Sequence, residues 1–296
     1  MTDGFERERL PPWLRGAPGT RGQTHRIKAK LRAGRLHTVC EAARCPNLAQ
    51  CFSAPTATFL LLGDRCTRGC TFCAVGRGAA EPPDPNEPNE VARAARELGL
   101  RHVVLTSVTR DDLPDGGAGH FARTILAVRG VLPDASVEVL VPDFAAREDS
   151  VRAVAGAGPD VFNHNVETVP RLYPAVRPGA DFARSVGLLA LARRLAPEAL
   201  IKSGMMVGLG ETDDEVREVM GRLRAAGCDI LTIGQYLRPT RRNLPVDRWV
   251  PPEEFTRWEA EGRALGFARV FAGPLVRSSY SAAEVATRAR DDKRKG

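Results

Sequence analysis

The chain has 296 residues, of which 43% are hydrophobic, and a formal net charge of +7. That length can bury a full core, and no apolar run approaches the eighteen or more residues of a membrane span. The first fifteen residues mix charges with Pro11 and Pro12 and lack the apolar stretch of a signal peptide. We therefore expect a cytoplasmic protein without a membrane partner.

Strand and helix patterns alternate through the middle of the chain. Up to about residue 33 the sequence is polar, basic and rich in glycine and proline, which predicts little regular structure. From Thr56 onward short apolar segments predict strands, and amphipathic segments between them predict helices. The predicted strands are residues 56–63, 102–107, 136–141, 161–166, 201–208 and 229–237, and the predicted helices are residues 87–98, 119–131, 147–157, 180–195 and 213–226.

Strict alternation implies right-handed crossovers and a parallel sheet, either open or curled toward a barrel. Polar residues gather at or just after the predicted strand ends, for example at 109–112, 163–167 and 235–238. In parallel barrels the carboxyl-terminal rim assembles the chemistry, which favours the curled form. We predict an α/β fold: a partial (β/α)6 barrel of the TIM type over residues 56–245. An N-terminal extension, 1–55, and a C-terminal helix and extension, 246–296, should cover its mouth.

Six of the seven cysteines lie between Cys40 and Cys73. In a reducing cytosol such a group holds metal more often than it forms disulfides. Cys66, Cys70 and Cys73 follow the first predicted strand, and three thiolates on a short loop can hold three irons of a cubane cluster. The fourth iron then stays open to a substrate or cofactor. A structural zinc site would favour two C-x-x-C pairs, and a closed ferredoxin-type cluster would need a fourth cysteine nearby.

Cys40, Cys45 and Cys51 form a second triad, with gaps of four and five residues. Three sulfurs again leave one iron without a protein ligand, so the fourth ligand must come from elsewhere in the chain. The remaining cysteine, Cys228, lies in an apolar segment that predicts a strand, and this indicates a core position rather than a ligand.

The spacing of the later triad, with Phe72 before its last cysteine, is the signature of the radical S-adenosylmethionine (SAM) superfamily. The chain also resembles lipoyl synthase in the sequence Arg277, Ser278, Ser279, Tyr280, although the histidine that usually follows is Ser281 here. The other matching runs are residues 39–52, 63–78, 106–119, 162–178, 202–212 and 231–244.

The resemblance implies two 4Fe–4S clusters. The open iron of the first binds the amino and carboxylate groups of SAM and yields a 5′-deoxyadenosyl radical. The auxiliary cluster takes a serine hydroxyl as its fourth ligand, and oxygen is a more easily displaced donor than thiolate on this iron. The implied ligands are Cys66, Cys70 and Cys73 for the radical cluster, and Cys40, Cys45, Cys51 and Ser279, or alternatively Ser278, for the auxiliary cluster.

The same resemblance implies sulfur insertion at carbons 6 and 8 of an octanoyl group on a carrier-domain lysine, with sulfide supplied by the auxiliary cluster. The carriers would be acyltransferase subunits of 2-oxoacid dehydrogenases and the glycine cleavage H protein. An electron donor such as ferredoxin or flavodoxin and a cluster-rebuilding protein would also be needed. The candidate SAM contacts are Phe72, Thr109, Asp111, Asn165, Glu167, Lys202 and Gln235, whereas Met205 and Met206 are expected in the core.

Three other functions remain open from the sequence. A radical enzyme that thiolates RNA would also use two clusters and a basic surface, but 296 residues leave no room for an added nucleic-acid module. A two-cluster electron carrier would need closed clusters, and a zinc-stabilised module would need zinc spacings. The arginines are spread along the helices with no aromatic-interleaved basic stretch, so we expect no nucleic-acid partner. An Arg-rich rim could instead steer an acidic carrier domain.

Overall fold

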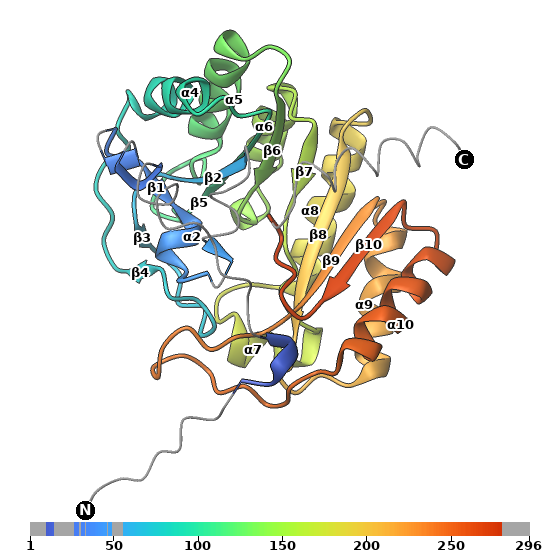
Figure 1. Ribbon diagram of the computed structural model, residues 1–296. Helices are drawn as coiled ribbons and strands as arrows, with labels where there is room; N and C mark the ends of the chain where they lie inside the picture. The colour runs from blue at the N-terminus through green and yellow to red at the C-terminus, as the bar shows by residue number, and fades with distance from the viewer. Residues whose placement is uncertain are drawn as a thin grey trace, which may run out of the picture.

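A computed structural model describes residues 10–14, 27–29, 31–32, 34–45, 47–48 and 56–279. Cys51, Tyr280 and Ser281 lie outside the described residues. One eight-stranded sheet organises the molecule, in the order β1-β2-β5-β6-β7-β8-β9-β10 (Figure 1). Its strands are β1 (His37–Thr38), β2 (Thr56–Leu61), β5 (His102–Ser107), β6 (Ser136–Leu140), β7 (Val161–Asn163), β8 (Leu200–Val207), β9 (Ile230–Gln235) and β10 (Arg269–Gly273).

All neighbours from β2 to β10 pair in parallel, and β1 pairs antiparallel with β2 at the edge. β1 and β10 end the strand order without pairing with each other, so the barrel is partial. The six predicted strands are confirmed, with ends that shift by up to three residues. β10 was not predicted: it lies beyond residue 245, where we expected a C-terminal helix and extension, and it continues the sheet beside β9.

Helices cover the outer face of the sheet (Figure 1). The five predicted helices are present as α4 to α6, α8 and α9, and α10 supplies the expected C-terminal helix. None of the described helices is long and apolar enough to cross a membrane. The helices are α2 (Val39–Ala42), α4 (Glu87–Glu97), α5 (Ala118–Val131), α6 (Glu148–Gly156), α7 (Tyr173–Val176), α8 (Phe182–Leu195), α9 (Asp213–Ala225) and α10 (Pro252–Ala264), with 3₁₀ turns η1 (Pro12–Leu14), η2 (Phe144–Ala146) and η3 (Pro170–Leu172).

A layer of buried polar side chains crosses the lower barrel interior on β6, β7 and β8. Lys202 is fully buried, and its Nζ lies 2.9 Å from Glu138 Oε1. Asn163 donates to the same oxygen at 3.1 Å. Burial alone would raise the pKa of Glu138, but the charge of Lys202 and the neighbouring His102 ring together outweigh it and hold that pKa well below its usual range. This buried ion pair therefore links β8 to β6 inside the barrel.

Candidate active site

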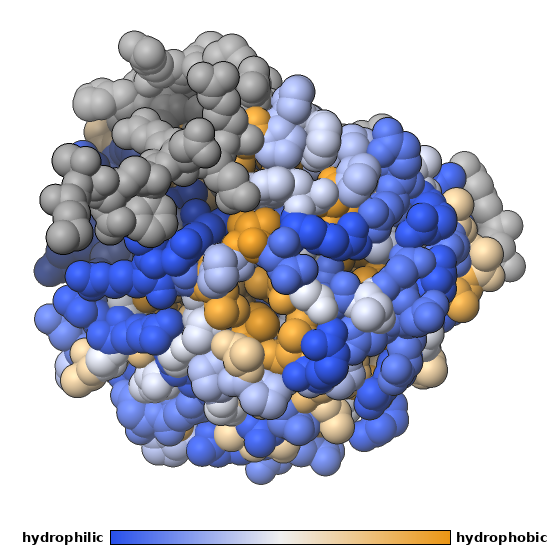
Figure 2. Space-filling view, turned by 90° about the horizontal axis from the view of Figure 1, so that it is seen from below, coloured by the Kyte–Doolittle hydropathy of each residue, from blue (hydrophilic) through white to orange (hydrophobic). Residues whose placement is uncertain are grey.

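A cavity of about 650 Å³ lies at the carboxyl ends of the strands. Residues from the N-terminal segment, the loop after β2, the strand ends and the segment after β10 all line it. The loop after β9 runs along the bottom of Figure 1, and the face seen from that side shows apolar residues surrounded by hydrophilic ones (Figure 2). The charged side chains that line the cavity are Glu167 and six arginines, Arg44, Arg68, Arg77, Arg177, Arg238 and Arg277.

Cys66, Cys70 and Cys73 all line this cavity and are half-buried. Cys66 ends the short strand β3 (Arg65–Cys66), which pairs with β4 (Gly76–Arg77). Backbone N–H groups point at two of the sulfurs, from Arg68 to Cys66 Sγ at 3.4 Å and from Val75 to Cys73 Sγ at 3.5 Å. Burial raises the pKa of Cys73 to about 11, so a cluster that binds here must displace the thiol proton.

Two braces hold this loop in place. The guanidinium of Arg68 bonds Asp111 at 2.8 Å and Asp143 at 2.7 Å. Asn243, from the loop after β9, donates to the carbonyls of Thr71 at 3.0 Å and Cys73 at 2.9 Å. Neither Asp143 nor Asn243 was expected from the sequence, because their partners lie far away in the chain.

The surroundings of the buried Arg177 side chain indicate whether a negatively charged cluster fits beside Cys70. Its Nη1 donates to the Val166 carbonyl at 3.1 Å and to the Tyr173 hydroxyl at 2.9 Å. Its Nε is buried without a hydrogen-bond partner among the described residues. The guanidinium charge acts on Cys70, where it partly offsets the increase in pKa that burial causes. A cation with a spare donor beside a thiolate fits an iron–sulfur cluster, whose potential depends on such hydrogen bonds.

Within the described ranges, no three His, Cys, Asp or Glu side chains are close enough to share one metal ion. A cubane cluster takes one thiolate at each of several iron corners, so a cluster triad does not need to converge on one point.

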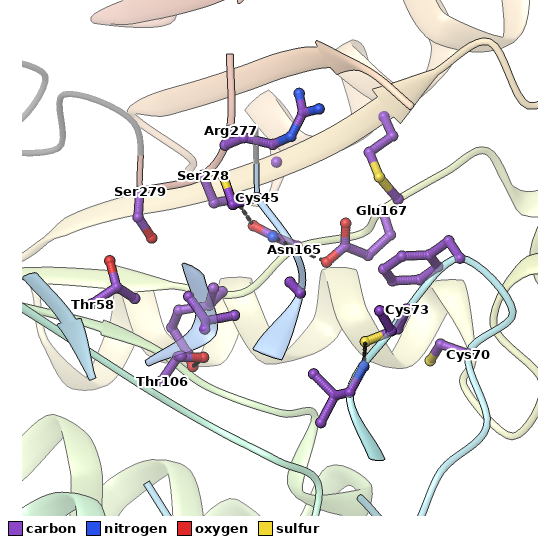
Figure 3. A pocket seen from close by; sticks show the side chains of 18 of the residues that line it. Cys45, Thr58, Cys70, Cys73, Thr106, Asn165, Glu167, Arg277, Ser278 and Ser279 are labelled. Atoms are coloured by element: carbon purple, nitrogen blue, oxygen red, sulfur yellow. Dashed lines mark hydrogen bonds between the residues drawn. The ribbon is translucent and has the colours of Figure 1, made fainter. Parts of the chain in front are cut away.

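Residues of the earlier triad reach the same cavity. Cys40 lies in α2 and is buried, Cys45 follows the helix, and both line the cavity with Ser278 and Ser279. Figure 3 shows Cys45 and the two serines on one side of the view and Cys70 and Cys73 on the other. The third member, Cys51, lies outside the described residues. The structure thus brings both sets of cysteines and the C-terminal serines to one cavity.

Two contacts place the C-terminal segment inside the barrel. Asn47 Nδ2 donates to the Leu275 carbonyl at 2.7 Å and ties this segment to the N-terminal one. Gly234 on β9 allows the close approach, because a Cβ there would lie 2.1 Å from the carbonyl oxygen of Val276. Any larger residue would push the segment away from the strand.

Four of the expected SAM contacts line the cavity: Phe72, Thr109, Asn165 and Glu167. Asp111 does not line the cavity, and its carboxylate pairs with Arg68 at 2.8 Å. Lys202 is inward-facing but lies one layer below the cavity, two residues before Gly204, where it pairs with Glu138. We predicted both residues as SAM contacts because they are polar and lie at strand ends, and the sequence does not reveal their partners, Arg68 and Glu138.

Gln235 also lies outside the cavity. Side chains alternate along a strand, so Gln235 faces away from the side that Gly234 presents to the cavity. Its Oε1 accepts from Val250 N at 2.8 Å, and its Nε2 donates to the Arg248 carbonyl at 3.1 Å. Met205 is buried in the core as we expected, and both Met205 and Met206 also line the cavity.

Two family models match the chain. The Radical SAM superfamily matches residues 60–223, and the N-terminal domain of lipoyl synthase of the Radical SAM family matches residues 2–45. The chain is 54% identical over 285 residues to lipoyl synthase of Thiobacillus denitrificans, covering 96% of this chain and 92% of that one. It is 56% identical over 274 residues to lipoyl synthase of Caldanaerobacter subterraneus subsp. tengcongensis, covering 93% and 96%.

Solved structures share the fold at low identity. HydG, a maturase of FeFe-hydrogenase, has a TM-score of 0.56 at 14% identity, covering 83% of this chain and 61% of that chain. HemN, the coproporphyrinogen III oxidase of Escherichia coli, has a TM-score of 0.51 at 15% identity, covering 72% and 53%. The chain therefore spans between about half and two thirds of the length of these two solved chains.

The parallel partial barrel and the cysteine loop after its first long strand define a radical SAM enzyme. The resemblance seen in the sequence is confirmed at more than half identity over most of the chain. The chain belongs to the lipoyl synthase family, whose cofactors are SAM and 4Fe–4S clusters.

Proposed function

We propose that the protein inserts two sulfur atoms, at carbons 6 and 8, into an octanoyl group that is amide-linked to a lysine of a carrier domain. The product is the lipoyl group. The observation that carries this proposal is that cysteines of both triads and the C-terminal serines line a single cavity. A sulfur donor and a radical source must face the same carbon atoms, because a primary carbon radical lasts only where competing partners are excluded.

We assign the radical cluster to Cys66, Cys70 and Cys73. When bound, the clusters and SAM supply the electron, the abstracting radical and the sulfide. Residues 1–55 and 246–296 would then act as extensions that bring auxiliary-cluster ligands to the barrel of residues 56–245. The proposed auxiliary ligands are Cys40, Cys45, Cys51 and Ser279.

Glu167 has the position to orient the amino group or ribose of SAM. It is the single carboxylate among the residues that line the cavity in the described part of the chain. Its backbone has a positive φ of 65°, and it bonds β8 on both sides: Glu167 N donates to the Gly204 carbonyl at 3.0 Å and Met206 N to the Glu167 carbonyl at 2.8 Å. A left-handed conformation of a non-glycine residue costs energy and is typical of functional positions. Phe72, Thr109 and Asn165 are the neighbouring candidates.

The cavity lining suits an aliphatic chain. Leu60, Val108, Leu140 and Met205 face it together with alanines and other apolar residues. A saturated C–H bond has no acidity that a side-chain base could use, so the chain's own role is to hold the acyl group and exclude water.

The partners follow from this chemistry. Octanoylated carrier domains, namely acyltransferase subunits of 2-oxoacid dehydrogenases and the glycine cleavage H protein, would supply the substrate. A ferredoxin or flavodoxin would supply electrons, and a second protein would rebuild the spent auxiliary cluster. Together with the six clustered cysteines, these partners favour a cytoplasmic location.

Anaerobic turnover on an octanoyl-lysyl peptide tests the proposal, with dithiolated product and 5′-deoxyadenosine measured together. The wild type should give both, and an iron count near eight per chain should accompany them. Cys45→Ala should lose sulfur insertion and retain SAM cleavage, whereas Cys228→Ala, at a core position with no exposed surface, should retain both. SAM cleavage without thiolated peptide in the wild type would remove the lipoyl function, and thiolation of RNA offered alongside would favour the alternative substrate.

A further inference from the structure

The two adjacent serines of the C-terminal segment have different surroundings. Ser278 Oγ donates to Asn165 Oδ1 at 2.7 Å. The amide of Asn165 then donates through Nδ2 to Glu167 Oε1 at 3.0 Å. Ser279 lines the cavity, and its hydroxyl has no hydrogen-bond partner among the described residues. Figure 3 shows the hydrogen-bonded series Ser278–Asn165–Glu167 running from the side of Cys45 toward that of Cys70 and Cys73.

A hydroxyl has one proton to donate, and Ser278 gives it to a side chain. That bond fixes which end of the Asn165 amide faces Glu167, since only Nδ2 can donate to a carboxylate. If the bond were lost, the amide could turn and present its oxygen to the carboxylate instead. The orientation of Glu167 therefore depends on a residue that lies 113 positions further along the chain from Asn165.

Gly204 makes room for this contact. A Cβ at position 204 would lie 2.7 Å from Ser278 Oγ and 2.9 Å from Asn165 Oδ1, the two atoms that share the hydrogen bond. It would also lie 2.6 Å from Thr232 Oγ1. The absence of a side chain at this position of β8 thus leaves the space that the hydrogen bond between the C-terminal segment and the end of β7 occupies.

We propose that Ser278 is a positioning residue that couples the segment carrying the auxiliary-cluster ligand to the carboxylate at the SAM site. Ser279 is the ligand, and Ser278 couples the position of that ligand to the orientation of Glu167 through its hydrogen bond to Asn165. SAM then binds best when the C-terminal segment is seated, so a chain whose sulfur donor is displaced binds SAM weakly. This inference rests on the proposed function for the identity of the two sites.

The test measures SAM affinity of the anaerobically reconstituted enzyme without octanoyl substrate, by calorimetry and by the change in the spin signal of the reduced radical cluster. Ser278→Ala should weaken SAM binding about tenfold, the effect of losing about one hydrogen bond, while both clusters are retained. Ser150→Ala is the matched control, because this buried hydroxyl donates to the Asp115 carbonyl at 2.9 Å away from the cavity. Its SAM affinity should equal that of the wild type.

A second variant perturbs the same bond from beneath. Gly204→Ala should weaken SAM binding at least as much as Ser278→Ala, and the double variant should be no weaker than Gly204→Ala alone. Gly221→Ala on α9, where a Cβ would meet nothing within 4 Å, is its control. Wild-type SAM affinity in Ser278→Ala with both clusters present would overturn the coupling. Loss of the auxiliary-cluster signal with unchanged SAM affinity would show a purely structural role and also overturn it. Failure of the wild type to thiolate the octanoyl peptide would instead count against the proposed function.

Discussion

Replacing Lys202 with methionine should destabilise the protein strongly. The side chain is fully buried, and its removal leaves the Glu138 carboxylate in the barrel interior with the Asn163 amide and the His102 ring, whose Nε2 lies 3.4 Å from Glu138 Oε2, as its remaining neighbours. Removing one partner of a buried ion pair costs about 3–5 kcal/mol, a large part of a total stability of about 5–15 kcal/mol. With a urea m value of about 3 kcal/mol per molar, a loss of about 4 kcal/mol lowers the unfolding midpoint by about 1.3 M.

Urea unfolding followed by circular dichroism measures this effect on the metal-free chain. The double variant Lys202→Met with Glu138→Leu removes both charges and should regain part of the loss. A remaining deficit of about 1–3 kcal/mol is expected because Asn163 Nδ2 loses its acceptor. The double variant should also bind SAM like the wild type after reconstitution, since neither residue lines the cavity. A Lys202→Met midpoint within about 0.3 M of the wild type would refute the ion-pair reasoning, and weak SAM binding by a stable double variant would return Lys202 to the SAM site.

Three further outcomes are expected. Asn243→Ala removes two hydrogen bonds to the radical-cluster loop, together about 2 kcal/mol, and should slow SAM cleavage in a folded chain. The control Arg242→Ala, at the exposed neighbouring residue, should not slow it. Release of 5′-deoxyadenosine measures SAM cleavage in both variants. The hydrogen bonds from Arg171 and from the Thr212 backbone lower the pKa of Glu215 from 4.5 to about 2, so their stabilising effect is complete above pH 4.5 and is lost as the pH falls from there toward 2. The thermal unfolding midpoint of Glu215→Gln should consequently fall less than that of the wild type as the pH is lowered over this range. Finally, Arg44, Arg77 and Arg238 line the cavity without a carboxylate partner in the described residues. The kcat/KM for an acidic carrier domain should therefore drop at least about tenfold from low to high salt. The kcat/KM for a neutral octanoyl peptide should not change.

The alternation of elements and the two cysteine triads could be read from the sequence because both are local patterns. The period of apolar residues over a few turns decides whether a segment forms a strand or a helix, and this located β2 and β5 to β9. The ligand spacing of Cys66, Cys70 and Cys73 is set within eight residues. β10 was missed because its sequence, RVFAG, is short and lacks alternation, and it becomes a strand only by pairing with β9.

The sequence by itself therefore determined the class of fold, the loop that would hold the radical cluster and the family of the protein. Tertiary structure alone decided what each polar strand-end residue does. Lys202 and Glu167 read alike along the chain, yet one is neutralised in the barrel interior and the other faces the cavity, because burial and partners come from different strands. Ser278 and Ser279 are adjacent residues of the same type, and the sequence does not distinguish them. Their proposed roles differ because Ser278 bonds Asn165, 113 residues away in the chain. Such contacts depend on loop closure and packing, which no local pattern records.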